Sequence, residues 1–120
     1  PAALIPWAAR ATPTDIAALA PVVLRVAAAG DGRANSLLTL AVEELALHVR
    51  TLARSLFVDE RAAVPVALAG GLLGRGGGLR RRLEQRLKTA VPGAQLRQEP
   101  VEPARGAVRG ALRLLGVALA

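Results

Sequence analysis

A chain of 120 residues is one domain at most, and its core must be built from Ala, Leu and Val because Phe57 and Trp7 are the only aromatic residues. The absence of cysteine excludes disulfides, thiolate metal sites and a cysteine nucleophile, and one histidine, His48, is too few for a metal cluster. The net charge of +7 is spread along the chain without interleaved aromatic residues for base stacking, so we expect no nucleic-acid partner.

The sequence shows neither a membrane span nor a signal peptide. The longest uncharged stretch, residues 62–74, is too short to cross a bilayer and contains Pro and Gly. We therefore expect a cytoplasmic protein with no membrane partner. The chain begins with Pro1 rather than Met, which suggests a fragment of a longer protein.

The first third of the chain reads as helical after an irregular start. Residues 1–12 are apolar and are expected to be irregular. Thr12, Pro13 and Asp15 then predict a helix start, because they form a Thr-x-x-Asp capping box with proline at the first helical position. Residues 15–29 are helical in pattern, but Pro21 divides them into two short helices that end at Gly30.

A long helix is predicted over residues 33–57, capped by Asp31. Apolar residues at alternating steps of four and three predict one buried stripe: Leu38, Val42, Leu45, Val49, Leu52 and Leu56. His48 follows Glu44 by one turn, and we interpret it as a surface residue rather than a general base.

Residues 65–73 are the most informative segment. Val66 to Ala69 are apolar without alternation, which predicts an interior strand covered on both faces. Gly70 and Gly71 follow at its carboxyl end, where open α/β sheets bind ligands and where a bare backbone allows close approach. The segment has neither the lysine and hydroxyl of a P-loop nor the spacing of GxGxxG. A plain turn before a solvated glycine linker remains the alternative reading.

The remaining elements complete an α/β pattern. A helix is predicted over residues 79–90, with Leu79, Leu83 and Leu87 inward and an exposed charge ladder of Arg80, Glu84 and Lys88. A polar, edge-like strand is predicted over residues 95–101, and Pro103 begins the last helix, whose solvated face carries Arg105, Arg109 and Arg113. Two parallel strands cannot form an independent sheet, so the pattern predicts the end of a larger α/β domain.

Three motifs in this order resemble the C-terminal part of the BadF/BadG/BcrA/BcrD-type ATPase family, which includes the N-acetylglucosamine kinases of the actin-like superfamily. They are AAGDGRA at residues 28–34, VALAGGL at 66–72 and GAVRGAL at 106–112, and the resemblance runs from about Leu4 to Leu115. It implies that residues 1–120 form a single partial domain. This would be the C-terminal portion of a ribonuclease-H-like lobe, helix-rich with two strands.

The resemblance also implies which residues have a role. It places Gly70, Gly71 and Leu72 against the adenosine part of ATP. The family's Gly-Asp-Pro-x-Ala element matches residues 30–34, with Gly32 in place of proline, and we interpret Asp31 as a helix cap rather than a ligand. The family's phosphate loop, its catalytic aspartate and its sugar-binding residues have no counterpart, so no catalytic or metal-binding residue is assigned and the chain alone is not a complete enzyme.

The expected parent protein is an ATP- and Mg-dependent kinase of N-acetylglucosamine or a related amino sugar. One alternative is an ATPase subunit or activator of a CoA-ester reductase or dehydratase; those activators carry cluster-binding cysteines, and this stretch has none. The other alternative is a non-catalytic basic domain that meets an acidic partner. In the first two cases the partner of this chain is the remainder of the same protein or a second copy.

Overall fold

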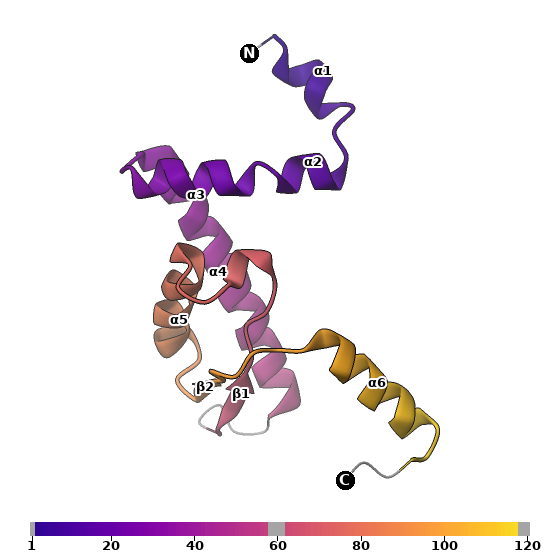
Figure 1. The fold of residues 1–120 in the computed structure, drawn as a ribbon. Coiled ribbons are helices and arrows are strands. Elements are labelled where there is room, and N and C mark those ends of the chain that lie inside the picture. Colours follow the sequence, from indigo (N-terminus) through magenta and orange to yellow (C-terminus); the bar gives the residue numbers. More distant parts are fainter. Residues whose placement is uncertain (1, 58–61, 118–120) are drawn as a thin grey trace.

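The structure, a computed structural model, describes residues 2–57 and 62–117. Its elements are six α-helices, one short 3-10 helix and two strands (Figure 1): α1 (Leu4–Ala8), α2 (Pro13–Ala17), α3 (Ala20–Ala28), α4 (Gly32–Leu56), β1 (Val64–Val66), η1 (Gly71–Leu73), α5 (Gly78–Ala90), β2 (Ala94–Leu96) and α6 (Pro103–Leu114). The strands run parallel. A helix-rich α/β chain with two strands is therefore confirmed for the described residues.

The N-terminal helices begin where side chains satisfy their first amides. The Thr12 Oγ1 accepts a hydrogen bond from the Asp15 amide at 3.2 Å, and the Thr12 amide donates to the Asp15 carboxylate at 2.8 Å, which confirms the capping box. The break between α2 and α3 falls at residues 18–19, before Pro21, because proline fits the first turn of α3. The segment 1–12, expected to be irregular, contains the five-residue helix α1.

The long helix α4 begins at the predicted cap. The Asp31 carboxylate accepts a hydrogen bond from the Ala34 amide at 2.8 Å, and Gly30 makes the turn before it with a φ of 95°. The inner face of α4 buries Leu38, Val42 and Ala46.

The predicted apolar stripe of α4 is wrong at its C-terminal end. Leu52 and Leu56 are 58% and 72% exposed, whereas Ala53 packs against the core. A seven-residue repeat drifts by about 20° per heptad on a helix of 3.6 residues per turn, so the later leucines rotate away from the core.

The predicted strands are shorter and more exposed than expected. Strand β1 covers residues 64–66 rather than 65–69, and β2 covers 94–96 rather than 95–101. Val64 and Val66 are buried, but Pro65 and Ala67 are exposed, so the expectation of a strand covered on both faces is wrong. The reason is that α4 and α5 both pack on the face that carries the two valines.

The free edge of β1 carries a proline. The Val64 amide donates to the Gly93 carbonyl and the Arg97 amide donates to the Val66 carbonyl, each at 2.8 Å. The backbone N–H and C=O groups of residues 64 and 66 therefore point toward β2, and those of residue 65 point toward the unpaired edge. Because Pro65 has no N–H, this edge has no unpaired donor at residue 65.

Helix α5 supplies the centre of the core. Leu79, Leu83 and Leu87 are 5%, 1% and 0% exposed, as predicted, and they pack with the inner faces of α4 and β1. The predicted exposed charge ladder on α5 is wrong at Arg80, which is only 7% exposed. It is the one buried charged residue among those the structure describes.

The last helix stands apart from this core. It begins at Pro103 as predicted, but it projects from the body (Figure 1) and buries no residue. Taken singly, no helix within residues 2–57 and 62–117 is long and apolar enough to cross a membrane; the segment 13–28 and α4 reach that length and composition only as a pair bent by 119°.

Candidate functional site

The glycine pair lies in the loop that leaves the carboxyl end of β1. Gly70 has a φ of 102°, in the left-handed region that side chains avoid, so the turn itself requires glycine at this position. Gly71 then begins η1, which runs to Leu73. The structure therefore brings the three predicted contact residues, Gly70, Gly71 and Leu72, into one exposed turn.

Gly71 differs from Gly70 in a way that bears on function. Its φ is not positive, and a Cβ placed on it would meet no atom within 4 Å. The fold therefore does not require glycine at residue 71. Its bare backbone is open to an approaching molecule, and Leu72 next to it is 49% exposed. A flat ligand that needs to lie close to the main chain would find room here.

The other side of this loop is anchored by the buried Arg80. Its Nη1 donates to the Leu73 carbonyl at 3.2 Å, and its Nε donates to the Glu84 carboxylate at 2.7 Å. The Arg80 side chain is 9% exposed and that of Glu84 is 27% exposed. The guanidinium thus ties the end of η1 to the first turns of α5. Arg75, at the far end of the loop, donates to the Gln98 carbonyl.

Sequence reasoning missed the role of Arg80. The i,i+4 spacing of Arg80 and Glu84 is that of a solvated ion pair on a helix surface, and the sequence therefore predicts an exposed Arg80. A signal was present: Arg80 follows Leu79 and precedes Leu83, so a helix that buries both leucines holds its side chain at the rim of the core.

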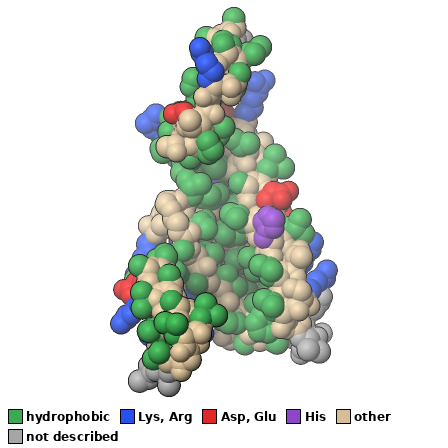
Figure 2. Space-filling model, turned by 90° about the vertical axis from the view of Figure 1, so that its right-hand side faces the viewer, with side chains coloured by type: hydrophobic (Ala, Val, Ile, Leu, Met, Phe, Trp, Pro, Cys, Tyr) green, Lys and Arg blue, Asp and Glu red, His purple; other side chains and the backbone are tan. Residues whose placement is uncertain are grey.

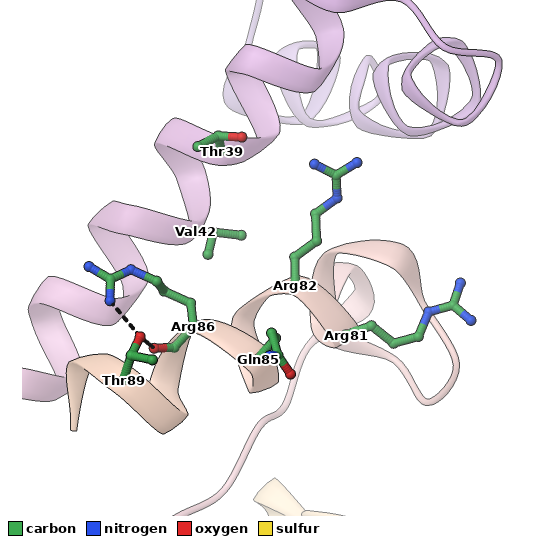
Figure 3. Close-up of a pocket in the computed structure, with 7 residues that line it drawn as sticks. All are labelled: Thr39, Val42, Arg81, Arg82, Gln85, Arg86 and Thr89. Atoms are coloured by element: carbon green, nitrogen blue, oxygen red, sulfur yellow. Dashed lines mark hydrogen bonds between the residues drawn. The ribbon is translucent and has the colours of Figure 1, made fainter. Parts of the chain in front are cut away.

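Two hollows lie beside α5. One, of about 410 Å³, is lined by α3, α4 and the start of α5: Leu24, Ala27, Ala28, Leu38, Gly78, Arg81 and Arg82. The other, of about 520 Å³, lies between α4 and α5 and is lined by Thr39, Val42, Arg81, Arg82, Gln85, Arg86 and Thr89 (Figure 3). Gly70, Gly71 and Leu72 line neither hollow, so the structure does not bring the glycine turn into them.

The arginines of the α4–α5 groove differ in their bonding. Arg86 makes two hydrogen bonds to the Glu43 carboxylate, at 2.7 and 2.9 Å, and this bonding lowers the pKa of Glu43 and raises that of Arg86. Arg82 donates to the Asn35 side chain and is directed toward the N-terminal part of α4 (Figure 3). Arg81 points away from α4. The groove is therefore basic with one neutralised arginine.

The described residues offer no group that could form a metal centre. Across residues 2–57 and 62–117, no group of three or more His, Asp or Glu side chains could hold a metal ion. The Asp31 carboxylate is committed to the α4 cap, and His48 is exposed on α4.

Comparison of the chain with known family models, with curated proteins and with solved structures finds no match.

Proposed function

We propose that this chain is the C-terminal part of the nucleotide-binding lobe of an ATP-dependent amino-sugar kinase, of the N-acetylglucosamine kinase type, with a ribonuclease-H-like fold. In this proposal the turn of Gly70, Gly71 and Leu72 lies against the adenosine of ATP. The phosphate loop, the catalytic base and the sugar site belong to other parts of the protein. The acceptor is N-acetylglucosamine or a related amino sugar.

The observation that carries the proposal is the place of Gly71, whose open backbone directly follows the turn that leaves strand β1. A glycine that neither φ nor packing requires is costly, because it increases the conformational freedom lost on folding. It lies directly after the turn that leaves a parallel strand, where α/β proteins bind their ligands. An adenosine that approaches the main chain at van der Waals distance gives a physical reason for it.

The proposal assigns the adenosine part of ATP to the glycine turn and leaves its metal to other parts of the protein. The glycine turn offers a bare, open backbone, with the exposed Leu72 to cover one side of a flat ring. No group of three or more His, Asp or Glu side chains in the described parts of the chain could hold a metal ion, and the proposal assigns no Mg²⁺ ligand to them. In the parent enzyme the metal would help to neutralise the charge of the ATP phosphates during transfer.

The first test is the coding sequence upstream of Pro1. An Asp-Gly-Gly phosphate loop in the same reading frame is expected, and a complete reading frame without one would refute the kinase proposal.

The second test is kinetic and uses the complete protein. Gly71→Val should raise the KM for ATP at least about tenfold and leave the KM for the sugar within about twofold, because the branched side chain occupies only the space of the nucleotide. Gly74→Ala is the matched control from the same loop: its Cβ would make an ordinary contact of 3.8 Å, so both KM values should stay near wild type. An unchanged KM for ATP in a folded Gly71→Val enzyme would remove the adenosine assignment.

A further inference from the structure

Arg80 occupies a place that is unusual for a cation. The chain has 16 Lys and Arg residues, and Figure 2 shows those on one side of the molecule, in blue, projecting from the surface. Arg80 is instead 7% exposed, the only buried charged residue within residues 2–57 and 62–117. It is also the third residue of α5, whose first turn holds no acidic residue. Both the loss of solvation and the positive end of the helix dipole disfavour a positive charge there.

The two hydrogen bonds of the Arg80 guanidinium have different effects. Glu84 lies one turn further along the same helix, accepts from the Arg80 Nε at 2.7 Å and offsets its charge locally. The Leu73 carbonyl, which accepts from Nη1 at 3.2 Å, belongs to the last residue of η1. The pair with Glu84 needs no group outside α5. Only the second bond connects the helix to the loop that leaves β1.

The loop of residues 70–78 needs such a connection because of its composition. Six of its nine residues are glycine, and glycine loses more conformational freedom on folding than any other residue. A hydrogen bond from the Leu73 amide to the Gly70 carbonyl, at 3.1 Å, closes the turn. A segment so rich in glycine populates many conformations unless groups outside it hold it in one.

Leu73 is the point at which the turn is held to the body of the protein. Its side chain is partly buried and packs against the hydrophobic core, and its carbonyl is the acceptor for Arg80. The residues just before it are open to solvent: Leu72 is 49% exposed, and a Cβ on Gly71 would meet no atom within 4 Å. Arg80 therefore holds the buried end of a turn whose exposed end presents Gly71 and Leu72.

We propose that Arg80 is a positioning residue of the nucleotide site: it does not touch the ligand but holds the glycine turn in the conformation that binds adenosine. This inference rests on the proposed function. The apparent affinity of a site falls in proportion to the fraction of molecules that have the binding conformation. A turn released from Arg80 has that conformation less often, so ATP binds more weakly although no direct contact is lost.

The test is steady-state kinetics of the complete protein. Arg80→Met should raise the KM for ATP by about fivefold, the factor that one hydrogen bond of ordinary net strength represents. The KM for the sugar and kcat should stay within about twofold, because the sugar site and the catalytic base belong to other parts of the protein. Arg80→Lys keeps the charge but lacks the fork that joins the carbonyl to the carboxylate. It should show the same split, also where Arg80→Met fails to fold.

Two control variants separate positioning from charge and from stability. Arg81→Met removes an equal charge at the neighbouring, exposed position and should leave the KM for ATP within about twofold. Val91→Ala opens the core at the opposite end of α5, where Val91 is 5% exposed, and destabilises the protein away from the loop. Its KM for ATP should also stay within about twofold. A rise in either control as large as that in Arg80→Met overturns the proposal.

Hydrogen exchange provides a readout that does not depend on turnover. Without nucleotide, the Leu73 amide of Arg80→Met should exchange at least about fivefold faster relative to the amides of α5, and saturating ATP should return it toward the wild-type rate. Unchanged exchange of this amide overturns the proposal.

Gly71→Val distinguishes the failure of this inference from that of the proposed function. If it raises the KM for ATP while Arg80→Met and Arg80→Lys do not, the adenosine site stands and Arg80 has no positioning role. If Gly71→Val leaves the KM for ATP unchanged, the turn does not bind adenosine and both proposals fail.

Discussion

Replacing the buried Arg80 by methionine should destabilise the protein through the loop that precedes α5. Methionine keeps an unbranched stem in the space of the arginine but removes the guanidinium. Two bonds are then lost: the one to the Glu84 carboxylate at 2.7 Å and the one to the Leu73 carbonyl at 3.2 Å.

The magnitude follows from burial. A hydrogen bond to a charged group contributes about 1.5–3 kcal/mol. Because the Glu84 side chain is 27% exposed, the lower end applies to the first bond. The longer, second bond adds about 0.5–1 kcal/mol. We therefore expect Arg80→Met to lower the free energy of unfolding by about 2 kcal/mol, close to a 30-fold change in the folded-to-unfolded ratio.

Urea unfolding followed by circular dichroism measures this loss, and hydrogen exchange locates it. Amides of residues 71–77 should exchange faster in the variant, while those of α5 beyond its first turns should change in proportion to global stability. Arg81→Met is the matched control: Arg81 is adjacent and exposed, so its loss should stay within about 0.5 kcal/mol. Equal stability of the two variants would show that the Arg80 bonds contribute nothing.

Three further predictions concern the core, acid stability and activity. Leu87→Ala, at a fully buried position, should cost about 3–5 kcal/mol by chemical denaturation, whereas Leu52→Gln, on the exposed side of α4, should cost less than about 0.5 kcal/mol; similar losses would place the core elsewhere. The hydrogen bonds from Arg86 lower the pKa of Glu43 in the folded protein. The stability that this pair contributes is therefore complete above the pKa of the unfolded carboxyl, and it is lost as the pH falls through the lower folded value. Glu43→Gln should flatten that part of the curve of stability against pH, and an unchanged curve would contradict the pairing. The 120-residue chain alone should show neither kinase nor ATPase activity, and turnover that scales with purified protein would mean the catalytic groups lie within it.

Local chemistry predicted the helix starts well. Caps act over a few residues and depend on side chains that the sequence displays, so the starts at Thr12 and Asp31 are found in the structure. The inward face of α5 was equally readable, since three leucines at four-residue spacing leave little ambiguity.

The predictions that are wrong depend on which elements pack against each other in the folded chain. The period of the α4 leucines is close to both 3.5 and 3.6, and only the packing against α5 shows that Ala53 rather than Leu52 faces inward. The apolar run after Pro65 has the composition of an interior strand, but which of its faces is covered depends on where both helices pack. Arg80 looked like surface charge because its second acceptor, the Leu73 carbonyl, belongs to a loop whose path is not encoded in any local pattern.

The sequence predicts the glycine turn, but it does not predict that its two glycines have different backbone conformations. Both glycines look alike in the printed chain, and only the backbone angles separate them. The positive φ of the turn requires glycine at residue 70, whereas Gly71 has an ordinary φ and an open backbone.

Pro65 has a consequence for how copies of this protein behave when crowded. An open strand edge normally offers alternating donors and acceptors along which identical chains can stack into fibrils. The central residue of β1, whose backbone groups point toward the free edge, is a proline. An incoming strand would therefore find no N–H donor at the middle of β1. The free edge of β1 is therefore a poorer template for strand addition than an edge with all of its donors.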